Sequence, residues 1–208
     1  MGSHTTSGSK RAFAPVRRAE RDEIDAVARL MSRAFNEDTI QQWCMSCDDT
    51  FGVIELELHE VTRQLTLQRT LWVTDDLSGV IAWMPPGTDY DNALLDSIVN
   101  PALAERGGQP ERQVGFWEWA DGHRPAEPHW YVDVVAVDPD RRGCGLGSHL
   151  LDDGLARLDV LGAPAHLITD KPRSSLWYGR HGFETQSLED APDGGPPVWF
   201  MWRPARES

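Results

Sequence analysis

Apolar residues recur along this chain at two spacings, and each spacing predicts a different element. A helical repeat predicts helices from Asp22 or Glu23 through Ala34 and over 51–67, 91–105, 111–120 and 146–161. Short apolar runs predict strands at 130–137 and 165–169. The polar segment Asp75–Gly79 predicts a hairpin turn. The pattern therefore predicts helices and strands of an α/β (α+β) domain.

The run over 130–151 combines a strand, a glycine-rich turn and the start of a helix. Val132 to Val137 is almost wholly apolar, as is typical of a strand buried on both faces, and Pro139 prevents its extension. The turn that follows contains Arg141, Arg142, Gly143, Gly145 and Gly147. Glycines let the backbone approach a ligand closely, and the N–H groups that begin a helix bind anions. The stretch therefore predicts a pyrophosphate site.

Three kinds of glycine loop can bind a pyrophosphate, and their spacings differ. A Rossmann loop needs Gly-x-Gly-x-x-Gly, whereas the glycines here have the spacing Gly-x-Gly-x-Gly. The Gly-Lys-Ser/Thr of a P-loop is absent from the sequence. What is present is Arg142-x-x-Gly145-x-Gly147 after Val-x-Val-Asp-Pro, which resembles the coenzyme A loop of the GNAT N-acetyltransferase superfamily. A tight strand-to-helix connection without a ligand is the structural alternative.

A second motif of that superfamily follows one helix and one strand later. Tyr178 precedes Gly182 and Phe183 in the order Tyr-x-x-x-Gly-Phe, which is similar to the superfamily's tyrosine on a short helix beside the thioester. The resemblance implies that Tyr178 donates a proton to the departing thiolate. Its alternatives are to orient the sulfur or to fill the core.

The resemblance also implies a fold and a donor. The expected GNAT fold is a central mixed sheet of about six to seven strands, flanked by helices and with splayed central strands. The acyl donor would be acetyl-CoA, with no metal. The residues expected to bind it are Val135, Val137, Arg142, Gly143, Cys144, Gly145, Leu146, Gly147, Ser148 and Ser174. The length of 208 residues predicts a single domain, which we expect over 15–208. The polar residues 1–14 before it are expected to form a disordered tail.

A closer likeness in layout is to puromycin N-acetyltransferase and its actinobacterial relatives. The segment His123–Trp130, just before the central strand, resembles theirs, and so does the layout of the strands that this resemblance implies at 16–19, 71–74, 80–84 and 198–202. Two positions depart from the expected pattern. Asp133 replaces an apolar residue of the central strand, and Lys171 stands where many superfamily members have an asparagine. The acceptor is therefore not carried over from the resemblance.

Asp133 is the first candidate for a general base. In a regular strand Asp133, Val135 and Val137 share one face, so the carboxylate would point where Val135 points. Glu127, His129 and a chain of water molecules are the alternatives.

The acceptor is predicted from charge and aromatic residues. The net charge of −13 disfavours nucleic acid and anionic membranes, and it attracts cations, although solubility explains it equally well. With Trp117, Trp119 and Tyr131 near the expected cleft, it predicts a small cationic amine, and the puromycin N-acetyltransferase-like layout implies one of the antibiotic or natural-product type. A non-catalytic acyl-CoA-binding module and a protein N-acetyltransferase are the alternatives. The expected assembly is a monomer or homodimer.

Three cysteines bear on the compartment. Cys44 and Cys47 form Cys-x-x-Cys in a helical, polar neighbourhood, where a redox pair is disfavoured, and Cys144 lies in the glycine loop. No disulfide framework, signal peptide or bilayer-length apolar run is visible in the sequence. We therefore expect a cytoplasmic enzyme.

Overall fold

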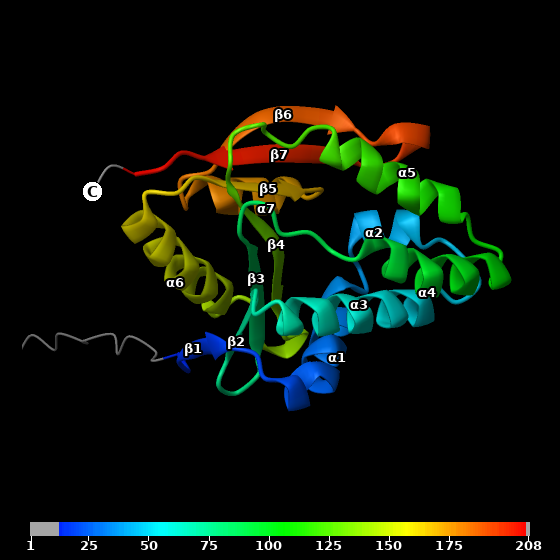
Figure 1. Cartoon of the computed structure of the whole chain (residues 1–208), viewed down its shortest axis with the longest axis horizontal. Helices are drawn as coiled ribbons and strands as arrows, with labels where there is room; N and C mark the ends of the chain where they lie inside the picture. Colours follow the sequence, from blue (N-terminus) through cyan, green and yellow to red (C-terminus); the bar gives the residue numbers. More distant parts are fainter. Residues whose placement is uncertain (1–12, 207–208) are drawn as a thin grey trace, which may run out of the picture.

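The chain folds around one seven-stranded sheet with helices on both faces (Figure 1). The computed structural model describes residues 13–206, so most of the tail predicted at 1–14 lies outside the described residues. Phe13 and Ala14 are described, and they contact the start of a helix: Phe13 stacks on His149, and the Ala14 carbonyl lies 3.2 Å from His149 Nε2.

The elements follow the predicted order closely. The strands are β1 Val16–Arg18, β2 Leu71–Thr74, β3 Gly79–Met84, β4 Trp130–Val137, β5 Ala165–Thr169, β6 Glu184–Asp190 and β7 Pro197–Arg203. The helices are α1 Ile24–Phe35, α2 Thr39–Cys44, α3 Thr50–Leu67, α4 Asn92–Glu105, α5 Pro110–Asp121, α6 Leu146–Leu161 and α7 Pro172–Gly179. Short 3-10 turns cover Arg21–Glu23, Pro139–Arg141 and Pro192–Gly194.

The sheet is mixed, and its central strands part. The strand order is β1-β2-β3-β4-β5-β7-β6, and only the β4–β5 pair is parallel. These two strands pair at Trp130 with Ala165 and at Tyr131 with His166, and nowhere further along β4. The predicted mixed sheet with splayed central strands is confirmed.

A bulge in β4 changes which way Asp133 points. On β3 the neighbours Ala82 and Trp83 pair with Val134 and Val132, so Asp133 is an extra residue between two paired positions. Val135 and Val137 pack against the core beneath α6, whereas Asp133 bonds Tyr90 on the α3 and α4 side. The prediction that Asp133 shares a face with Val135 is therefore wrong.

The bulge also bears on how β4 is buried. Val132, Val134 and Ala136 are buried, but Val135 and Val137 are only half-buried and line a cavity. The strand expected to be buried on both faces is therefore partly open on one of them.

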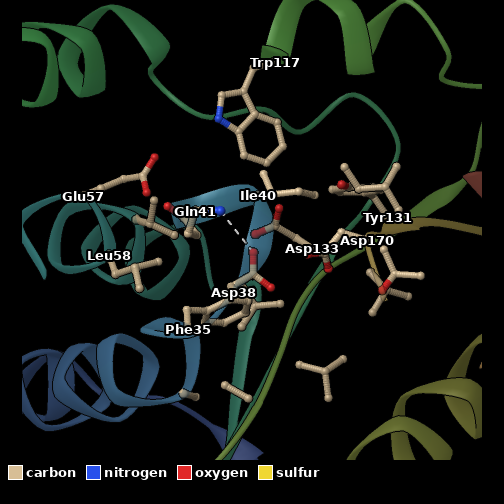
Figure 2. A pocket seen from close by; sticks show the side chains of 18 of the residues that line it. Phe35, Asp38, Ile40, Gln41, Glu57, Leu58, Trp117, Tyr131, Asp133 and Asp170 are labelled. Atoms are coloured by element: carbon tan, nitrogen blue, oxygen red, sulfur yellow. Dashed lines mark hydrogen bonds between the residues drawn. The ribbon is translucent and has the colours of Figure 1, made fainter. Parts of the chain in front are cut away.

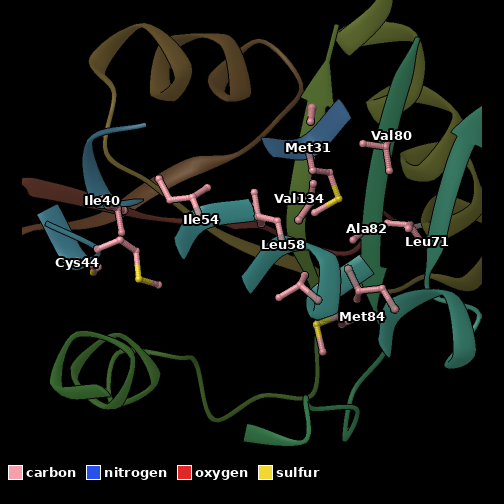
Figure 3. Packing of buried hydrophobic residues seen from close by; sticks show 14 of the residues in the cluster. Met31, Ile40, Cys44, Ile54, Leu58, Leu71, Val80, Ala82, Met84 and Val134 are labelled. Carbon is pink, nitrogen blue, oxygen red and sulfur yellow. The ribbon is translucent and has the colours of Figure 1, made fainter. Parts of the chain in front are cut away.

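The core has two parts, one on each face of the sheet. One part joins α1, α3, α4 and α5 to the strands, and Figure 3 shows its centre, where Met31, Leu58 and Val134 meet. The other lies under α6 and includes Leu150, Leu155 and Phe183. Among the helices described between residues 13 and 206, none is long and apolar enough to cross a membrane.

Candidate active site

The glycine loop ends in an open helix start. Gly143 and Gly145 have φ angles of 77° and 94°, in the left-handed region that favours glycine, and Gly145 is the residue before α6. The first helical bond runs from the His149 N–H to the Gly145 carbonyl at 3.0 Å. Within residues 13–206, the N–H groups of Leu146, Gly147 and Ser148 have no acceptor. This end of α6 is thus suited to bind an anion.

One continuous cavity of about 790 Å³ begins beside this loop. It reaches from α6 along β4 to α2, α3, α4 and α5, and it occupies the region where β4 and β5 have parted. The predicted site residues that line it are Asp133, Val135, Val137, Arg142, Gly147, Ser174 and Tyr178. The cavity therefore joins the loop motif to the tyrosine motif.

The other predicted donor-binding residues lie at the loop but do not line the cavity. They are Gly143, Cys144, Gly145, Leu146 and Ser148. Leu146 is buried, and the Cys144 thiol donates to the Arg141 carbonyl at 2.9 Å, so these two offer a ligand their backbone rather than their side chains. Ser148 accepts a hydrogen bond from the Trp177 indole at 3.0 Å.

Arg142 and Lys171 each make a polar contact near the glycine loop. Arg142 donates to the Ala34 carbonyl at 2.8 Å and so ties the loop to α1. Lys171, which departs from the superfamily pattern, pairs with Asp38 at 3.0 Å. Both residues line the cavity.

Tyr178, the first residue of the second motif, is buried at 9% exposure. Its ring lies 5.8 Å from that of Phe183 and 4.6 Å from that of Trp177. Burial raises its pKa, so the phenol stays protonated at neutral pH. Within the described residues its hydroxyl makes no hydrogen bond, and the side chain lines the cavity. Tyr178 can therefore donate a proton or a hydrogen bond to a ligand.

Asp133 is held by a tyrosine from the loop before α4. The Tyr90 hydroxyl donates a short hydrogen bond to its carboxylate. Burial raises the pKa of Asp133, while the bond from Tyr90 and the charge of Arg124 lower it. Of the alternative bases, Glu127 and His129 do not line the cavity, so only Asp133 among the predicted candidates does.

Glu57 is a site residue that the sequence prediction missed. It lies on α3, is only 5% exposed and lines the cavity. Burial raises its pKa to about 7, and the Asp133 charge adds to this, while the amides of Gln41 and Gln113 lower it. Its signal in the sequence is a carboxylate on an apolar stripe, one turn after Val53 and before Val61.

Charge is divided along the cavity. Figure 2 shows Glu57 and Asp133 on opposite sides of the part near α2, with Trp117 above them in this view. The carboxylates that line the cavity are Glu37, Asp38, Glu57, Asp89, Asp96, Glu118, Asp121, Asp133 and Asp170. The cationic lining residues are Arg124, Arg142, Lys171 and Arg173, and the last three belong to the glycine loop and the start of α7. One end thus suits an anion and the other a cation.

Two of the three predicted aromatic residues line the cavity. Trp117 and Tyr131 do so, whereas Trp119 packs against Phe116 and Phe200 in the core. Arg124 lies 4.7 Å above the Tyr131 ring.

The cysteines are free, and Cys44 is buried. Burial raises its thiol pKa, which disfavours a reactive thiolate. Over the described part of the chain, no group of three or more His, Cys, Asp or Glu side chains is placed to hold a metal ion.

Part of the chain is similar in sequence to known acetyltransferases. Residues 98–185, which contain the strand, the glycine loop and Tyr178, match the acetyltransferase (GNAT) domain. A mycothiol acetyltransferase of Acidimicrobium ferrooxidans is 35% identical over 114 residues, or 49% of this chain. The match spans only 36% of that relative's length.

Solved structures share the fold across almost the whole chain. A Corynebacterium glutamicum protein, described as histone acetyltransferase HPA2 and related acetyltransferase, has a TM-score of 0.69 at 23% identity, covering 95% of this chain and 99% of its own. A putative arylalkylamine N-acetyltransferase 7 from Aedes aegypti has a TM-score of 0.62 at 17% identity, covering 91% and 86%. A PaiA N-acetyltransferase from Thermoplasma acidophilum, solved with coenzyme A, has a TM-score of 0.54 at 10% identity, covering 91% and 98%.

The chain is thus similar to the acetyltransferase (GNAT) domain over residues 98–185, which hold both motifs, and it shares the fold of solved acetyltransferases, with a mixed sheet whose central strands part.

Proposed function

We propose that the chain transfers an acetyl group from acetyl-CoA to the amine of a small cationic molecule. The observation that carries this proposal is the continuous cavity, because it connects the open start of α6 to a chamber lined by carboxylates. Tyr178 and Asp133 both line it.

The donor would bind along the loop and β4. Its pyrophosphate would accept hydrogen bonds from the N–H groups that begin α6, with Arg142 and Arg173 nearby. The pantetheine arm would pair with the free edge of β4 near Val135 and Val137, as an added strand pairs with a sheet.

The transfer would proceed by direct attack. The amine nitrogen forms a bond to the thioester carbonyl carbon, and the carbon–sulfur bond then breaks to release coenzyme A. The amine proton passes to Asp133, directly or through water, and the Tyr178 hydroxyl donates a proton to the departing thiolate. A backbone N–H of the free β4 edge would polarise the carbonyl oxygen.

The acceptor chemistry follows from the chamber. Carboxylates there favour a protonated amine, and Trp117 offers an aromatic face to a cation, whereas Arg124 already lies over the Tyr131 ring. An acceptor of the antibiotic or natural-product type, the puromycin N-acetyltransferase-like subgroup, a cytoplasmic location and a monomer or homodimer stay predictions. Protein N-termini, and acyl-CoA binding without catalysis, remain the competing functions.

A panel of amines with acetyl-CoA, read by release of free thiol, tests the proposal. We expect release to depend on a cationic small amine, and Tyr178→Phe to slow turnover about a hundredfold with unchanged donor affinity. If acetyl-CoA binds but no amine causes thiol release, the chain is an acyl-CoA-binding module without catalysis. If thiol is released only with a peptide N-terminus, the acceptor is a protein and not a small amine.

A further inference from the structure

Three buried oxygens in the acidic chamber lack a hydrogen-bond donor. They are Glu57 Oε2, Gln41 Oε1 and Gln113 Oε1, and none has a partner among residues 13–206. Glu57 and Gln113 are 5% and 6% exposed, and all three residues line the cavity. A buried acceptor without a donor costs about 1–3 kcal/mol, so the cluster has room for hydrogen-bond donors from a ligand or from water.

The three side chains form one cluster although they come from three helices. Gln41 lies on α2, Glu57 on α3 and Gln113 on α5, and both glutamine amides influence the Glu57 carboxylate. Figure 2 shows Gln41 beside Glu57, with Trp117 over them. The ligand group must therefore bring several donors to one point.

An ammonium group matches this requirement. It has three N–H donors and no acceptor, and its charge complements the carboxylate. Trp117, which also lines the cavity, adds an aromatic face. An anion or a carbonyl group would add further acceptors to a cluster that already lacks donors.

Glu57 and Asp133 provide two different anionic positions. Asp133 lies on β4, where the strands part, and its carboxylate already accepts the Tyr90 hydroxyl. Glu57 lies on α3, across the cavity, and its Oε2 is unpaired. A single ammonium group at Glu57 would leave the reacting position beside Asp133 empty.

We propose that the acceptor is a diamine, with one amine reacting beside Asp133 and the other held as an ammonium ion by Glu57, Gln41 and Gln113. The reacting half of this statement rests on the proposed acetyl transfer, whereas the ammonium site is defined by the unpaired oxygens alone.

The experiment compares matched amines in three proteins. Putrescine and butylamine, cadaverine and pentylamine differ only in the second amine. In the wild type we expect kcat/KM to be roughly tenfold to a hundredfold higher for each diamine than for its matched monoamine. This ratio corresponds to the free energy of a hydrogen bond to a charged group. Glu57→Gln should remove this preference, because it should lower kcat/KM for each diamine roughly tenfold to a hundredfold more than for its matched monoamine. Glu60→Gln is the control, because Glu60 lies on the same helix, pairs with Arg63 and does not line the cavity.

Two kinetic results would overturn the proposal. One is equal use of diamines and monoamines by the wild type. The other is an equal loss for both in Glu57→Gln, which would make Glu57 a base or a structural residue.

Calorimetric titration with putrescine, without acetyl-CoA, separates the site from the reaction. Putrescine binding that Glu57→Gln abolishes, without transfer to any amine, supports the ammonium site and refutes the transfer. Transfer to monoamines without a diamine preference supports the reaction and refutes the site.

Discussion

At the scale of single residues, Glu57 makes folding depend on pH. Its pKa is about 7 in the folded protein against an ordinary 4.5, so the unfolded chain loses this proton first as the pH rises. Stability is therefore lost between about pH 4.5 and pH 7. Glu57→Gln should raise the free energy of unfolding at about pH 8 by up to roughly 3 kcal/mol, and change it little at about pH 4. Urea unfolding at the two pH values measures this.

Glu60→Gln should show the opposite sign. The hydrogen bond from Arg63 lowers the pKa of Glu60, so its contribution is present above its unfolded pKa and is lost as the pH falls. If Glu60→Gln raised the free energy of unfolding at high pH as much as Glu57→Gln, burial of Glu57 would not be the cause of its effect.

Tyr90 tunes the proposed base. Its hydrogen bond lowers the pKa of Asp133, so Tyr90→Phe should raise that pKa. If Asp133 accepts the amine proton, the acidic limb of the kcat/KM profile should move to higher pH. Asp133→Asn should lose the rate at every pH. An unmoved limb in Tyr90→Phe would remove Asp133 as the base.

At the scale of elements, α6 rests on the sheet through a glycine. A Cβ atom on Gly154 would lie 2.1 Å from Trp83 Nε1, and Trp83 is buried in β3. Gly154→Ala should therefore cost about 1–3 kcal/mol through overpacking. Gly115→Ala on α5 is the matched control, because a Cβ there meets nothing within 4 Å, and it should stabilise by up to about 1 kcal/mol. Urea midpoints of both variants decide this, and equal midpoints would contradict the tight packing.

Periodicity predicted the helices and the central strands, because their apolar faces meet the core, and the resemblance in layout supplied four other strands. Neither predicted every feature. Periodicity missed β6, an edge strand whose residues are almost all exposed, so that no apolar alternation marks it. It also missed the bulge at Asp133, because local sequence does not determine the register with β3. Tyr178 and the glycine loop carry local motifs, whereas Glu57, Gln41 and Gln113 meet only through the packing of three helices.

At the scale of the whole molecule, charge should guide the acceptor. The net charge of −13 and the carboxylates of the chamber attract cations at long range. Salt weakens this attraction, because charges farther apart than about 8 Å are largely screened at physiological ionic strength. With saturating acetyl-CoA, kcat/KM for a cationic amine should fall as sodium chloride rises. A more acidic amine, largely neutral at the assay pH, serves as the control. Equal salt dependence for both would indicate that the charge serves solubility alone.

The parting of β4 from β5 places an unpaired strand edge inside the sheet rather than at its rim. Proteins usually shield such edges, because they recruit other strands. Here β3 pairs with the other edge of β4, and β7 pairs with the other edge of β5, so the unpaired edge lies between two paired halves of the sheet. We therefore expect this break to admit a thin peptide-like arm and to exclude a folded neighbour that could aggregate through the same edge.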